Sequence, residues 1–123
     1  MKNKSELIEC INKELAEQKS YLETNQIKTI YFGGGTPSVL NQSELSSILT
    51  TIEKEFEVLP DAEITLEANP DDLTQEKLWM IRESGVNRLS IGIQSFVARD
   101  LAFMNRSHTI LQATNAIKYA KEI

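Results

Sequence analysis

The chain has 123 residues, of which 41% are hydrophobic and 25% are charged, and its formal net charge is −5. This composition is typical of a globular domain and excludes a disordered chain. Basic residues are scattered, and no apolar run approaches the roughly 20 residues of a membrane helix. We therefore expect no nucleic-acid partner, no membrane span and a cytoplasmic location.

The cysteine content limits the chemistry of the chain. One cysteine, Cys10, excludes an intramolecular disulfide and also a multi-cysteine metal or cluster site built by this chain alone. Cys10 lies within a helical pattern, so we expect a half-buried thiol without a functional role.

The first half of the chain alternates between helix and strand. Apolar residues at helical spacing predict a helix over Ser5–Leu22. The apolar segment Ile27–Phe32 predicts a buried strand. Asn41 and Glu44 have the spacing of a capping box and predict the start of a second helix. The buried stripe expected for that helix is Leu45, Ile48, Leu49, Ile52 and Phe56.

The second half continues the same rhythm. A turn at Pro60–Asp61 should precede a strand over 62–68, where polar and apolar residues alternate. Thr74 is the expected N-cap of a helix that ends at Gly85 and contributes Trp79 to the core. A third strand is predicted over 87–94, a short helix over 97–104, and a last helix from a capping box at Thr109 and Gln112.

Strands that alternate with helices predict an α/β fold with parallel pairing. The second and third strands each send polar residues to one side and aliphatic residues to the other, which indicates the wall of a barrel with a polar lumen. Glu63 and Arg88 should pair in that lumen. Three strands cannot close a barrel, so we predict a partial (β/α) barrel whose open sheet edges favour self-association.

The glycine run after the first strand is the strongest candidate for a binding loop. Gly33-Gly34-Gly35 removes three consecutive side chains where a parallel strand ends, so backbone groups can approach a ligand closely. Thr36 adds a hydroxyl, and Pro37 stiffens the exit. Ligands of α/β folds and barrels bind at the carboxyl ends of strands, which favours a binding loop over a plain turn.

Polar residues also follow the other strands, at the same predicted rim. Glu67 suits an ammonium group, Gln94 a sugar hydroxyl, and Arg106 a carboxylate that it would bind through two parallel hydrogen bonds. Each has a simpler reading: Glu67 as a buried acid, Gln94 as a helix cap, Arg106 as a surface residue. His108, the only histidine, is expected to be a loop or cap residue rather than a catalyst. No nucleophile–base pair is found, so we predict no catalytic or metal-binding residue.

Four motifs together resemble one family. They are the segments 31–38 (YFGGGTPS), 63–70 (EITLEANP), 85–96 (GVNRLSIGIQSF) and 105–108 (NRSH). In this order they resemble the radical SAM family of oxygen-independent coproporphyrinogen III oxidases, and the forms EANP and GIQSF resemble its HemW-like branch of heme chaperones more than the oxidases themselves.

This resemblance implies a TIM-like radical SAM barrel, a [4Fe-4S] cluster, S-adenosylmethionine (SAM) that the cluster reduces to a 5′-deoxyadenosyl radical, and porphyrin or heme as the partner. By position it implies that the glycine loop (Gly34, Gly35 and Thr36) contacts the methionyl part of SAM. Glu67 would lie near the amino group, Gln94 at the ribose and Arg106 at the carboxylate.

The sequence departs from the family in its cysteines. The family binds its cluster with a C-x-x-x-C-x-x-C loop, whereas this chain has only Cys10. Without three thiolates no such cluster forms. We therefore expect residues 1–123 to be a single fragment of a radical SAM core domain, with part of the SAM pocket and no activity of its own. The alternative is an unrelated α/β module that binds an anion or nucleotide at the glycine loop.

Overall fold

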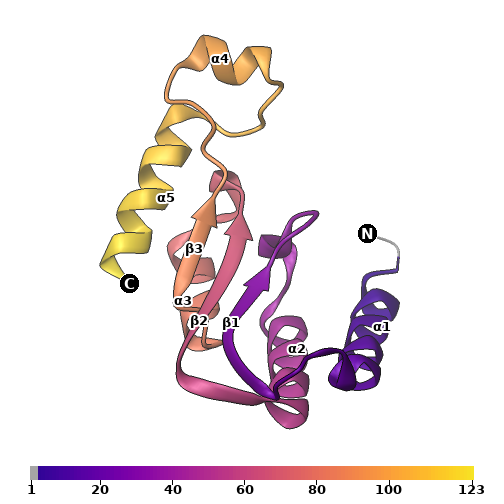
Figure 1. Ribbon diagram of the computed structural model, residues 1–123. Helices are drawn as coiled ribbons and strands as arrows, with labels where there is room; N and C mark the ends of the chain where they lie inside the picture. The colour runs from indigo at the N-terminus through magenta and orange to yellow at the C-terminus, as the bar shows by residue number, and fades with distance from the viewer. Residues whose placement is uncertain (1–2) are drawn as a thin grey trace. The chain divides into compact units, whose positions relative to one another are not determined.

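The computed structural model describes residues 3–123, which pack as two compact units (Figure 1). The first unit comprises the chain up to Ile30 together with Leu40–Glu63. The second comprises Tyr31–Val39 and Ile64–Ile123. All of the predicted site residues belong to the second unit.

The strands form one sheet in the order β1-β2-β3 (Figure 1). Their bounds are Gln26–Phe32, Glu57–Ala68 and Arg88–Ile91. β2 and β3 are parallel, with Thr65 opposite Arg88 and Ala68 opposite Ile91. Three parallel strands with flanking helices confirm the predicted α/β fold.

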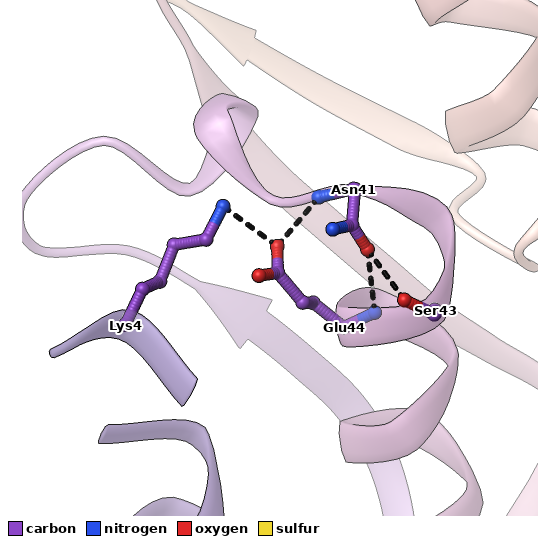
Figure 2. Close-up of polar contacts among 4 residues, drawn as sticks. All are labelled: Lys4, Asn41, Ser43 and Glu44. Atoms are coloured by element: carbon purple, nitrogen blue, oxygen red, sulfur yellow. Dashed lines mark hydrogen bonds and ion pairs between the residues drawn. The ribbon is translucent and has the colours of Figure 1, made fainter. Parts of the chain in front are cut away.

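In the first unit, α1 (Lys4–Glu17) and the short helix η1 (Gln18–Tyr21) precede β1, and α1 packs against α2 (Gln42–Glu55). The predicted capping box opens α2: Asn41 Oδ1 accepts from the Glu44 N–H at 2.9 Å, and Glu44 Oε2 accepts from the Asn41 N–H at 2.8 Å (Figure 2). Lys4 Nζ also lies 2.8 Å from Glu44 Oε2. One carboxylate therefore caps α2 and ties α1 to it.

Several expectations for the first unit need correction. The stripe on α2 is buried as predicted except Phe56, which lies just past its end and is half-buried. β1 is not a buried strand, because only Ile30 is buried in it. Cys10 is exposed rather than half-buried.

β2 runs straight through Pro60 and Asp61, where a turn was predicted. Its register with β3 begins only at Thr65. The earlier residues of β2 therefore need no hydrogen bonds toward β3, and a proline without an N–H is tolerated there.

The second unit holds the helices α3 (Gln75–Glu83), α4 (Ala98–Phe103) and α5 (Ile110–Glu122), with short helices η2 (Pro37–Val39) and η3 (Pro70–Asp72). The predicted caps are confirmed: Thr74 accepts from the Lys77 N–H, and Thr109 forms a capping box with Gln112. α5 packs against α3 and η3. The core of this unit consists of Leu66, Ala68, Leu73, Leu78, Ile81, Val86, Leu101, Ala113 and Ala116.

Two predictions for this unit are wrong. Trp79 is 53% exposed, because Leu78 and Ile81 form the buried face of α3 and Trp79 lies outside it. β3 ends at Ile91 instead of reaching Gln94, because the backbone turns at residues 92–95.

Candidate functional site

A cavity of about 370 Å³ lies where β2 and β3 end in the second unit. Five of the six predicted site residues line it: Gly35, Thr36, Glu67, Gln94 and Arg106. Pro37, Ala68, Asn69, Ser90, Ile91 and Gly92 complete the wall. The sixth, Gly34, donates its backbone N–H to Glu67 Oε2 at 3.3 Å. The residues predicted from separate motifs therefore meet around one cavity.

Glu67 connects β2 with the glycine loop. Its Oε1 accepts a 2.6 Å hydrogen bond from the Tyr31 hydroxyl, and its Oε2 accepts from Gly34. A Cβ built on Gly33 would lie 2.6 Å from Tyr31 Cε1 and 3.3 Å from Glu67 Cδ, so a side chain there would collide with this pair. Gly33 thus provides space, whereas Gly34 provides a backbone with φ +73° that favours glycine.

The hydrogen bond to Glu67 changes the acid strength of Tyr31. Because the phenol proton is shared with a carboxylate, the pKa of Tyr31 is raised above its usual value, and a contact with Ser90 partly opposes this shift.

Arg106 is positioned by the end of α4. Asn105 adopts φ +52°, its N–H donates to Ala102 O, and the N–H of Arg106 donates to Leu101 O at 2.9 Å. This is the Schellman pattern, in which asparagine can replace the usual glycine. Ser107 Oγ then donates to Asp71 Oδ2 at 2.7 Å, which ties this segment to η3.

The guanidinium of Arg106 is anchored on two sides. Its Nη2 donates to Gly92 O at 3.1 Å and to Asn69 Oδ1 at 3.3 Å. Its Nε is buried and has no hydrogen-bond partner among residues 3–123. Buried N–H groups are usually paired, so this donor fits an acceptor brought by a ligand.

Gln94 reaches the cavity from a tight turn. It has φ +65°, unusual for a residue with a side chain. A Cβ built on Gly92 would lie 3.4 Å from both Gln94 Nε2 and Arg106 Nη2, so these two side chains converge over Gly92. Gly92 therefore leaves the room in which they meet.

The lining combines one carboxylate, one guanidinium, two amides, two hydroxyls and bare backbone. Such a set is chemically complementary to a zwitterion that also carries hydroxyl groups. No group of three or more His, Cys, Asp or Glu side chains suited to a metal ion occurs within residues 3–123. Over the same range, no helix is long and apolar enough to cross a membrane.

The sequence prediction missed two residues that shape the cavity. Asn69 is not among the predicted site residues, but its side chain accepts from Arg106. Tyr31 was assigned to a buried strand, but it is 57% exposed and bonded to Glu67. The register of parallel strands could have suggested the pairing of Tyr31 with Glu67, since both precede loops at the same end of the sheet.

Comparison with known proteins agrees with this geometry. The family model of the radical SAM superfamily matches residues 11–123. The heme chaperone HemW of Lactococcus lactis is 36% identical over 115 residues, which cover 94% of this chain and 30% of that protein. Radical S-adenosyl methionine domain-containing protein 1, mitochondrial, of Dictyostelium discoideum is 39% identical over 113 residues, or 88% of this chain and 25% of that protein.

A solved structure extends the comparison to the fold. The Escherichia coli coproporphyrinogen III oxidase HemN, a radical SAM enzyme, matches with a TM-score of 0.86 and 25% identity over 98% of this chain and 28% of its own. The chain therefore belongs to the radical SAM superfamily. Within it, the relatives form the HemW- and HemN-like group that the four motifs predicted. The match covers less than a third of each of these proteins.

Proposed function

We propose that the chain supplies part of an S-adenosylmethionine pocket in a HemW- or HemN-like radical SAM core domain. The observation that carries this proposal is the meeting of Glu67, Gln94 and Arg106 with the glycine loop around one cavity. The methionyl part of SAM has an ammonium and a carboxylate, and its nucleoside part has hydroxyl groups, so its chemistry matches the lining.

Each residue has a proposed role. Glu67 accepts from the ammonium group, and Arg106 donates to the carboxylate through the side of its guanidinium that includes Nε. Gln94 bonds the ribose hydroxyls, and Gly34, Gly35 and Thr36 hold the methionyl chain against the backbone. All of these are binding roles, and no residue of the chain is proposed to transfer a proton or form a covalent intermediate.

The residues of this chain do not fit an iron–sulfur cluster. One cysteine is present, and it lies in α1 of the first unit rather than at the cavity. We propose that any cluster used with this pocket has its thiolates outside residues 1–123, and that this chain alone does not catalyse. Purified chain treated with iron and sulfide should stay colourless, and a stable brown species would contradict this proposal.

The acidic side chain at the glycine loop argues against the anion-binding alternative. The Gly34 N–H, which would receive a phosphate, already donates to Glu67 Oε2. A carboxylate at that position repels an anion and attracts an ammonium group. In addition, α2 starts at Gln42, well after the glycines, so its N-terminus belongs to Asn41. The family match does not favour this alternative either.

For the whole protein we propose a role in heme or porphyrin metabolism. Relatives named heme chaperones are 34–41% identical, whereas the oxidase structure is 25% identical, which favours heme delivery over oxidation of coproporphyrinogen. We further propose a cytoplasmic location and self-association through β1 and β3, the edges of the sheet. Imaging of a tagged chain tests the location, because the Dictyostelium relative is named mitochondrial. Sedimentation analysis tests the self-association.

Calorimetric titration of the purified chain with SAM tests the binding proposal. We expect saturable binding that Glu67→Gln weakens about tenfold, because a charge-assisted hydrogen bond is lost. Glu83→Gln makes the same charge change at an exposed position in the last turn of α3 and should bind SAM like the wild type. Equal affinities of the two variants, or no binding by the wild type, would overturn the proposal.

A further inference from the structure

His108 is buried in the second unit and has no place in the SAM roles proposed above. Its residue is 3% exposed, and its Nε2 lies 3.0 Å from Ile93 O. Its Nδ1 is buried and has no hydrogen-bond partner among residues 3–123. Buried polar atoms are usually hydrogen-bonded, and here only Nε2 is. The contact between Nε2 and Ile93 O is therefore the interaction to explain.

The carbonyl that His108 contacts closes a strained turn. The Ser95 N–H donates to Ile93 O at 2.7 Å across Gln94, whose φ is +65°. This pattern with a positive φ is the rare and strained form of the three-residue turn. Strained backbone persists only where its surroundings hold it. Ile93 O therefore accepts from two sides, once within the turn and once from His108, 15 residues further along the chain.

Arg106 and His108 hold successive carbonyls of the same segment. Arg106 Nη2 donates to Gly92 O, and His108 Nε2 lies on Ile93 O. Both residues follow α4, whose Schellman end fixes Arg106, and Thr109 fixes the start of α5 directly after His108. The segment 106–108 is thus anchored at both ends, and its side chains form hydrogen bonds with the turn that contains Gln94.

The hydrogen bond also defines the tautomer of His108. A carbonyl oxygen only accepts, so Nε2 must carry the proton. In the neutral ring Nδ1 is then an acceptor without a donor. Burial of such an atom is unfavourable, and an aliphatic side chain of similar size would avoid it. Packing alone therefore does not explain a histidine at this position, whereas a donor to Ile93 O does.

We propose that His108 is a positioning residue of the SAM pocket: by donating from Nε2 to Ile93 O, it holds the turn that presents the Gln94 amide to the ribose of SAM. This inference rests on the proposed SAM binding. His108 itself does not line the cavity that Gln94 lines.

The first test needs no ligand. His108 is the only histidine, so ¹⁵N spectra of the ring report on it without ambiguity. We expect a ring that carries a proton on Nε2 and an ordered Gln94 backbone amide. His108→Leu should make that amide mobile in relaxation measurements, whereas His108→Gln, whose amide offers a donor at a similar position, should keep it ordered. A ring protonated only at Nδ1, or an equally ordered Gln94 in all three proteins, would overturn the positioning role.

The second test measures SAM affinity of the same three proteins. His108→Leu should weaken binding about three- to tenfold, the value of one hydrogen bond, and His108→Gln should restore most of the loss. The Gln94 side-chain amide signals should shift on addition of SAM in the wild type and His108→Gln more than in His108→Leu. Equal affinity in all three would overturn the inference. Absence of SAM binding in the wild type would overturn the proposed function, while the ligand-free spectra would still report separately on the turn.

Discussion

Two loops of the second unit both contain residues with a positive φ, but they use different residue types at these positions. Gly34 and Gly35 follow β1 with φ near +70° (+73° and +72°), and Gln94 follows β3 with φ +65°. Glycine adopts such a conformation without steric penalty, whereas a residue with a Cβ is strained by roughly 1–2 kcal/mol. The glycine loop contributes backbone to the cavity, and the turn after β3 contributes a side chain.

The two loops differ in how many hydrogen bonds from other segments hold their conformation. The glycine loop needs few supports: Glu67 accepts from Gly34 on one side, and Ser38 Oγ donates to Asp72 Oδ2 at 2.5 Å on the other. The turn at Gln94 needs hydrogen bonds from Arg106 and His108, both contributed by a distant segment. A strained residue with a polar side chain in a cavity wall indicates a site in which that side chain is required.

Arg106→Lys should have the largest effect, because it removes the planar support of the Gln94 turn. We expect SAM affinity to fall about tenfold to a hundredfold, since a lysine cannot replace the guanidinium fork. A lysine ammonium also cannot bond Gly92 O and Asn69 Oδ1 in the geometry of the guanidinium, which should lower the free energy of unfolding by about 1–3 kcal/mol. Urea denaturation and calorimetric titration measure the two quantities.

Arg99→Lys is the matched control. Arg99 lies in α4 with a side chain that is 90% exposed, and its Nε is 3.8 Å from Asp100. Such surface pairs contribute little, so this variant should resemble the wild type in both measurements. If Arg106→Lys were as stable as Arg99→Lys, the turn after β3 would keep its conformation without the hydrogen bonds of Arg106.

Gly34→Ala tests the other side of the comparison. Nothing lies within 4 Å of a Cβ built on Gly34, so any effect comes from its backbone conformation and not from a collision. The left-handed φ penalises alanine, while the stiffer unfolded chain recovers part of that loss. The net result should be a decrease in the free energy of unfolding of about 0.5–1.5 kcal/mol. A stabilised variant would contradict the conformational argument.

Gln94→Gly should separate stability from binding. Glycine relieves the strain but raises the entropy of the unfolded chain, so the free energy of unfolding should stay unchanged or rise by up to about 1 kcal/mol. SAM affinity should fall about three- to tenfold, because the amide is lost. Asn105→Gly, at the end of α4, changes the other non-glycine residue with a positive φ among residues 3–123, and should match the stability effect without the loss of affinity. An unchanged SAM affinity of Gln94→Gly would mean that Gln94 has no binding role.

The contrast between the loops also explains what the sequence could and could not predict. Three consecutive glycines after a strand are visible in the sequence, and the loop was predicted to lie at a binding site. The positive φ of Gln94 could not be predicted from the sequence, because the hydrogen bonds that stabilise this turn come from the distant residues Arg106 and His108. The strand prediction accordingly ran on to Gln94, although β3 ends at Ile91.

The sequence pattern predicted the helices and strands better than it predicted which side chains are buried. The capping boxes at Asn41 and Thr109 are local patterns, and both are present. Burial depends on which neighbours exist, and in a sheet of three strands these are few. Trp79 and Tyr31, which are apolar enough for a core, are therefore more than half exposed. The cavity could be predicted because the carboxyl ends of parallel strands meet at one edge of a sheet.

Tyr31→Phe has the smallest expected effect and concerns the link between Glu67 and the glycine loop. The folded state binds the phenol proton more tightly than the unfolded state, because the proton is shared with Glu67. The pKa of Tyr31 is therefore raised, and its contribution to stability is fully present below about pH 10, the ordinary tyrosine value. That contribution is lost as the pH rises through the higher value of the folded state.

An absorbance titration of the phenolate measures this difference among the three tyrosines. Tyr31→Phe should remove the component that ionises at the highest pH, and the variant should lose less stability than the wild type as the pH rises above about 10. Tyr21→Phe, at a position that is 81% exposed, should leave that component in place. If both variants gave the same titration curve, the Glu67 carboxylate would not be held by Tyr31 in solution, and the backbone of Gly34 would be its remaining anchor at the loop.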